Sequence, residues 1–156
     1  MNVHGTSCPV SLRRLSRLFV YPWMLFLATA ASGADILSED FATLTDTAAP
    51  AGWTTSSSSD LDYTSSPYFG AATPSFKFKT NGQWLTSPSF ATGATDLQFW
   101  AYGNGGAGTV AVSGLVGGVW TLMESKGIAA SGATYDVTLN PQTTQIKFTF
   151  IRNTNN

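Results

Sequence analysis

Residues 145–156 read QIKFTFIRNTNN, and the first part of this stretch decides the fold class. Ile146, Phe148 and Phe150 alternate with polar residues, which is the period-two pattern of a β-strand with one apolar face. The residues RNTNN that follow are typical of a turn. The stretch therefore predicts a strand that covers a core with one side and meets solvent with the other.

The same alternation recurs along the chain. It is clear in DLQFWAYG at residues 96–103, where Leu97 and Phe99 share one face. No segment keeps apolar residues at helical spacing over three turns, and strand and turn signals alternate every 8–12 residues or so. The sequence therefore predicts an all-β fold, an antiparallel two-sheet β-sandwich of the jelly-roll type. Similar segments lie at residues 75–80, 83–90, 109–116, 119–125 and 133–140.

Two hairpins are expected from their turn residues. Asn81-Gly82 and Gly117-Gly118 each join two alternating segments, and both pairs readily adopt the positive φ angles of tight hairpin turns. The large aromatic side chains near the turns are expected to pack in the core rather than to contact a ligand, because a buried indole ring removes a large apolar area from water. These side chains are Trp53, Trp84 and Trp120.

The N-terminal segment has the features of a secretory signal peptide. Residues 1–17 hold three arginines, residues 18–31 are apolar, and small residues follow. The apolar run is shorter than the ~20 residues that a membrane-spanning helix needs. We therefore expect residues 1–33 to form a helical leader, removed near Gly33 or Ala34. No membrane association beyond export is expected, and the product is expected to be secreted or held at the cell surface.

Removal of the leader restricts the chemistry of residues 34–156. The only histidine and the only cysteine, His4 and Cys8, lie in the leader. The remaining module therefore excludes Ser-His-Asp and Cys-His catalysis, zinc sites built on His or Cys, and disulfides. Five of the eight basic residues remain, against nine acidic ones, so nucleic-acid binding is not expected. These features favour a binding module over an enzyme.

Several segments together resemble a known family. They are LSEDF (37–41), PAGW (50–53), SFKF (75–78), WLTSPSF (84–90), LQFWAYGNG (97–105), VWTLME (119–124), YDVTLN (135–140) and TQIKFTF (144–150). This pattern of strands and turns resembles the secreted jelly-roll modules of the cleaved-adhesin and choice-of-anchor J type, which are similar to MAM-like and galactose-binding-like domains. The resemblance covers roughly Leu37 to Asn156. It implies a non-catalytic module of a larger bacterial surface or secreted protein.

The chain departs from this family at its C-terminal end. Modules of this type continue past such a turn into a last strand with an acidic pair, which returns beside the first strand. Here the sequence ends at Asn156. The resemblance therefore implies a C-terminally incomplete module. The alternative is a natural short chain with an open sheet edge, to which a partner strand is expected to add.

Five polar or aromatic side chains are candidates for ligand binding. Gln98, Trp100 and Tyr102 share the strand face opposite the core-facing residues of 96–103, and exposed aromatic rings bind the apolar faces of sugars. The alternative is that a loop or a neighbouring domain covers this face. Tyr63 and Tyr68 lie in a polar loop and are expected at the rim of the sandwich, where loops often carry binding residues.

Two pairs of acidic residues need separate interpretations. Glu39 and Asp40 end the first expected strand, and the resemblance implies a structural calcium ion there; the alternative is two solvated carboxylates. Asp60 and Asp62 are expected to serve loop solubility and turn capping, because nothing in their spacing forces the two-carboxylate geometry of a glycosidase.

These observations predict a secreted, non-catalytic binding or adhesion module whose partner is a glycan or a cell-surface protein. The alternative is the N-terminal accessory domain of a secreted hydrolase. In that case a protease, nuclease or glycosidase domain would lie beyond residue 156.

Overall fold

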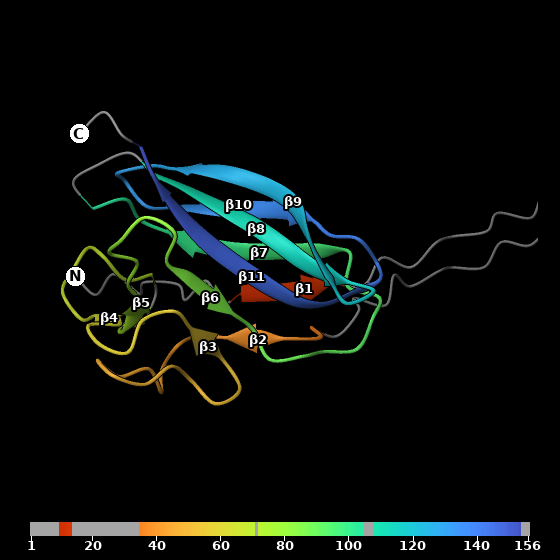
Figure 1. Cartoon of the computed structure of the whole chain (residues 1–156). Helices are drawn as coiled ribbons and strands as arrows, with labels where there is room; N and C mark the ends of the chain where they lie inside the picture. The colour runs from red at the N-terminus through yellow and green to blue at the C-terminus, as the bar shows by residue number, and fades with distance from the viewer. Residues whose placement is uncertain (1–9, 14–34, 71, 105–107, 154–156) are drawn as a thin grey trace, which may run out of the picture.

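The computed structural model describes residues 10–13, 35–70, 72–104 and 108–153, and all of the regular structure in them is β. Two antiparallel sheets pack face to face as a β-sandwich, which confirms the predicted fold class (Figure 1). Within the described residues, no helix is long and apolar enough to cross a membrane.

The larger sheet is built around the strand predicted from residues 145–150. In spatial order it contains β3 (Thr54–Thr55), β6 (Trp84–Thr86), β11 (Thr143–Arg152), β8 (Gly108–Val116) and β9 (Val119–Ile128). β11 lies at the centre and pairs with β6 on one side and β8 on the other. Its inward residues Ile146 and Phe148 are only 1% and 5% exposed, so the expected apolar face is confirmed.

The second sheet has four strands, and a small third sheet has two. The four strands are, in order, β10 (Ala133–Thr138), β7 (Asp96–Ala101), β1 (Val10–Arg13) and β2 (Ser38–Glu39). The small sheet pairs β4 (Asp62–Tyr63) with β5 (Ser75–Phe76) at one end of the molecule (Figure 1). β6 is much shorter than the strand expected over residues 83–90, and β2 ends at Glu39, close to the expected end of the first strand.

β1 was not expected, because its four residues fall within the predicted leader. They form an extended strand that pairs with β2 and with β7, rather than part of a helix. The rest of the leader lies outside the described residues. Export and cleavage near Gly33 or Ala34 stay predictions.

The two sheets meet through interdigitating inward side chains. Phe99 of β7 packs edge-to-face on Phe148 of β11, with ring centroids 5.3 Å apart, and Leu97 is completely buried. Trp53 is 6% exposed and packs in the same cluster, as predicted. Trp120 was expected to be packed but is 37% exposed on the outer face of the larger sheet.

One of the two expected hairpins is confirmed. Gly117 and Gly118 adopt φ values of +57° and +83° and join β8 to β9. The prediction of a hairpin at Asn81-Gly82 is wrong, although the turn forms. The strands on its two sides do not pair with each other: β5 pairs with β4, while β6 pairs with β3 and β11. Gly82 N donates to Phe150 O and Asn81 Oδ1 accepts from Arg152 N, so this turn is bonded to β11 and closes no ladder of its own.

Thr143 provides a stability test of the core. It is completely buried, and its hydroxyl has no hydrogen-bond partner in the described part of the chain. A buried unpaired polar group destabilises the fold, so Thr143→Val is expected to raise the free energy of unfolding by about 1 kcal/mol. Thr143→Ser keeps the hydroxyl and loses a methyl group, so it is expected to lower that free energy by about 1 kcal/mol. Urea unfolding measures both; a valine variant no more stable than wild type contradicts the prediction.

Candidate functional site

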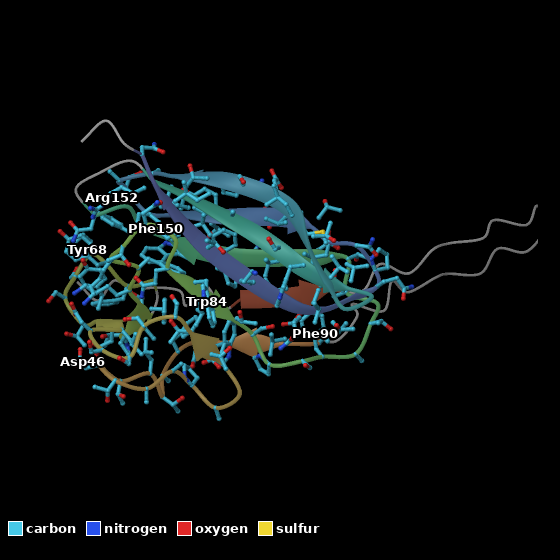
Figure 2. The ribbon with its side chains drawn as sticks, in the orientation of Figure 1. Asp46, Tyr68, Trp84, Phe90, Phe150 and Arg152 are labelled. Carbon is cyan, nitrogen blue, oxygen red and sulfur yellow. The ribbon has the colours of Figure 1, made fainter. Side chains whose placement is uncertain are left out.

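A cavity of about 620 Å³ lies at one end of the sandwich. It is bounded by the ends of β7 and β11, the start of β8, and the segment around β4 and β5. It reaches the surface, because the exposed residues Asn104, Arg152 and Asn153 line it. Figure 2 shows Tyr68, Phe150 and Arg152 gathered at this end of the molecule.

The inner wall of the cavity is made of phenylalanine rings. They lie close to one another: the centroids of Phe76 and Phe78 are 4.9 Å apart, and those of Phe78 and Phe150 are 6.1 Å apart. Gly108 begins β8 beneath the Phe150 ring, where an added Cβ would clash with the ring carbons of Phe150. A glycine is therefore required for the close approach of these two strands. The rings of this wall are Phe41, Phe76, Phe78, Phe99, Phe148 and Phe150.

Four of the five predicted ligand-binding residues line the outer part of the cavity. Tyr63, Tyr68, Trp100 and Tyr102 form a continuous series of rings, here called the ring cluster. The Tyr68 centroid lies 5.2 Å from that of Tyr63 and 5.1 Å from that of Tyr102, and the Tyr102 centroid lies 6.2 Å from that of Trp100. Asn104 Nδ2 donates a hydrogen bond of 2.8 Å to the hydroxyl of Tyr63. The structure thus brings together residues from the polar loop and from the end of β7.

Neighbouring loops cover part of the Trp100 ring. It is partly buried, and a Cβ added at Gly70 or at Gly132 would lie 3.4 Å or 2.8 Å from its atoms. The ring therefore contacts loops on part of its surface and lines the cavity with another part. Gln98 is not among the residues of the cavity wall; its Nε2 donates to Asp136 Oδ1 at 2.9 Å.

An ion-pair cluster anchors the loop that carries the tyrosines. Lys77 and Lys79 donate to the two carboxylate oxygens of Asp60 at 2.6 and 2.8 Å, and the Lys77 ammonium lies 4.6 Å from the centroid of the Tyr63 ring. The hydrogen bonds from Lys77 and Lys79 lower the pKa of Asp60, and the bond from Asp60 raises the pKa of Lys77. Asp60 therefore serves structure, and the lysines place positive charge on the cavity wall.

Glu39 and Asp40 also line the cavity, and both carboxylates already accept hydrogen bonds. Glu39 accepts from Trp53 Nε1 at 3.0 Å and from Phe41 N at 2.7 Å, and Asp40 accepts from Ala42 N at 2.9 Å. The described residues contain no group of three or more His, Cys, Asp or Glu side chains that could hold a metal ion. A structural calcium ion at this position stays a prediction.

The sequence interpretation missed the cationic and phenylalanine parts of the cavity. Lys77, Lys79 and Arg152 line it although they come from two segments far apart in the sequence. The alternation of Phe76 to Lys79 was recognised, but it predicted opposite faces of one strand. Of these four residues only Phe76 belongs to β5, and the next three are not paired in its ladder. The phenylalanine and the lysine side chains therefore both line the cavity.

Comparison with protein-family models, with curated proteins and with solved structures finds no match.

Replacing Asp60 with asparagine tests the anchor. Asp60 has φ 55°, a conformation that asparagine also tolerates, so Asp60→Asn removes the charge with little backbone effect. Because the pKa of Asp60 is lowered from its ordinary value of 3.8, its ion pairs stabilise the fold fully at pH values above 3.8. This stabilisation is lost as the pH falls through the pKa of the folded state. Because the pKa of Lys77 is raised from its ordinary value of 10.5, its ion pair stabilises the fold fully at pH values below 10.5. This stabilisation is lost as the pH rises past the pKa of the folded state.

The variant is therefore expected to unfold at a lower urea concentration than wild type near pH 7. The difference is expected to disappear as the pH falls well below 3.8, and again as it rises well above 10.5. Urea midpoints across this range measure it. A difference that is constant with pH would show that the ion pairs do not stabilise the loop.

Gly132 tests the position of the Trp100 ring. Gly132 has φ +67°, and an added Cβ would lie 2.8 Å from Trp100 and 3.0 Å from Tyr102. Gly118 has φ +83° with nothing within 4 Å of an added Cβ, so Gly118→Ala is the matched control. Both variants are expected to lose roughly 1–2 kcal/mol through backbone strain. Only Gly132→Ala is expected to shift the tryptophan fluorescence; equal spectra for both variants contradict the assigned packing.

Proposed function

We propose that this chain is a secreted, non-catalytic binding and adhesion module, and that the ring cluster binds a sugar unit of a cell-surface glycan. One observation carries the proposal. Aromatic residues from two segments, around Tyr63–Tyr68 and Trp100–Tyr102, converge on a cavity that reaches the surface. The resemblance to secreted jelly-roll modules, and the leader-like N-terminal segment, support the same function.

The chemistry of the cavity suits a sugar ligand. Its volume of about 620 Å³ lies within the ~300–1,000 Å³ usual for ligand pockets. Tyrosine rings offer flat apolar surfaces with a polar edge, which match the apolar faces and hydroxyl groups of a pyranose. Asn104, beside Tyr63, adds an amide that suits the hydroxyl groups of a sugar.

Tyr68 is the residue to replace first. Its ring lies between those of Tyr63 and Tyr102, and its loop position keeps it out of the core sheets. A glycan array screened with the wild-type protein identifies the ligand, and titration calorimetry then compares variants. Tyr68→Ala is expected to weaken binding about tenfold, or about 1.4 kcal/mol, with little change in melting temperature.

Trp120→Ala is the matched control, because it removes an exposed aromatic ring from the outer face of the other sheet. It is expected to leave glycan affinity unchanged. Two results would contradict the proposed function: no glycan retained by the folded wild-type protein, or equal loss of affinity in the two variants.

A further inference from the structure

Met123 occupies an irregular position at the rim of the larger sheet. The register between β8 and β9 shifts at this residue, which is the extra residue of a β-bulge and has no partner on β8. β9 is the last strand of its sheet, as Figure 1 shows, and the neighbouring Leu122 is 60% exposed. The Met123 side chain is half-buried and packs against the buried core residues. Its thioether is therefore within reach of a small solute.

The end of this side chain meets Thr143 at a glycine. Gly114 of β8 is buried, and a Cβ added there would lie 2.8 Å from Met123 Cε and 2.8 Å from Thr143 Oγ1. The two atoms therefore share the space that a larger residue at position 114 would fill. Gly114 pairs with Thr121 of β9 and with Ile146 of β11, so this space connects the edge strand to the central strand.

Thr143 brings an unused hydrogen-bonding group to this space. Its side chain is completely buried, and none of the described residues offers its hydroxyl a partner. Buried hydroxyl groups are nearly always hydrogen-bonded, because an unpaired one costs free energy. The thioether sulfur of a methionine is only a weak acceptor. The contact between the two side chains is therefore incomplete while Met123 is reduced.

We propose that Met123 is a site of S-oxidation by a peroxide, and that its sulfoxide oxygen accepts a hydrogen bond from the Thr143 hydroxyl. Oxidation converts an apolar thioether into a group with a polar oxygen on sulfur. The sulfur is bonded to Cε, so the new oxygen arises beside the Thr143 hydroxyl. Thr143 is the first residue of β11, so the bond ties the edge strand β9 to the central strand across β8.

The reaction balances with hydrogen peroxide as the oxidant. The thioether sulfur attacks one peroxide oxygen and gives up two electrons. An S–O bond forms as the O–O bond breaks, and the leaving hydroxide takes the proton of the transferred oxygen and departs as water. The methionine is thus oxidised to its sulfoxide, and the peroxide is reduced to water.

The unpaired hydroxyl decides how oxidation changes stability. A sulfoxide usually disrupts a core, because it places a polar group among apolar ones. Here the sulfoxide finds a donor that is already in place. The wild-type protein is therefore expected to lose less stability on oxidation than a variant without the hydroxyl. The inference goes beyond glycan binding and does not depend on it.

The test treats the full chain with hydrogen peroxide. Met1, Met24 and Cys8 also react, so Met123→Leu, which has a similar volume and no sulfur, is the matched control for them. Thr143→Val removes the hydroxyl, and Thr143→Ser retains it. Mass spectrometry of proteolytic peptides locates the added oxygen atoms, and urea unfolding compares the reduced and oxidised forms of each protein.

Met123 is expected to gain one oxygen atom while the wild-type protein stays folded. Oxidation is expected to raise the unfolding equilibrium constant of Thr143→Val about fivefold more than that of wild type, which is the effect of one hydrogen bond. Oxidation therefore removes the advantage that valine gives to the reduced protein. Thr143→Ser is expected to respond as wild type does, and Met123→Leu is expected to change little.

Three results would overturn the proposal. If Met123 resists peroxide in the folded protein and reacts only in urea, it is not a modification site. If oxidation affects wild type and Thr143→Val equally, the sulfoxide does not use the hydroxyl. If the wild-type protein unfolds on oxidation, the fold does not accommodate the sulfoxide. No sugar takes part in this experiment, so it stands or fails separately from glycan binding.

Discussion

The contact between Phe99 and Phe148 joins the two sheets and positions everything at the cavity end of the molecule. Phe99 lies on β7 and Phe148 on β11, and their rings meet edge-to-face at 5.3 Å. Because side chains alternate along a strand, burial of Phe99 directs Trp100 to the opposite face. The same packing that closes the core therefore sets the position of the ring cluster. The module achieves this without a disulfide, so its apolar contacts must stabilise it.

The loop around Tyr63 and Tyr68 depends on a different kind of interaction. Leu61 buries its side chain and β4 pairs with β5, and polar contacts add to this anchor: the Asp60 ion pairs, Lys77 over the Tyr63 ring, and the bond from Asn104 to Tyr63. Such contacts are partly exposed and individually weak. The ring cluster thus combines a half on β7 with a half whose position depends on charge as well as on burial of Leu61.

The strand pattern could be predicted because burial of one face leaves a local signal. Leu97, Phe99, Ile146 and Phe148 all face the core as their alternation indicated. The pairing of strands is not local, and here prediction failed. The Asn81-Gly82 turn forms as expected, yet its flanking strands join different sheets because the turn bonds to β11.

The candidate site was predictable only in part, for the same reason. Alternation and loop position identified Trp100, Tyr102, Tyr63 and Tyr68, which the structure brings together, and also Gln98, which it does not. Lys77, Arg152 and the residues after β2 are far apart in the sequence, and no local pattern relates them. Tertiary folding alone brings them to one cavity. β1 could not be anticipated, since its residues carry the signal of a leader.

The two halves of the ring cluster are held by different parts of the fold. Trp100 and Tyr102 belong to β7 and to the residues immediately after it, and β7 pairs with β10 as far as Ala101. This ladder holds Trp100 in place, while the Asp60 ion pairs hold Lys77 over the Tyr63 ring. Both halves of the ring cluster are then fixed before a sugar arrives, which lowers the entropic cost of binding it.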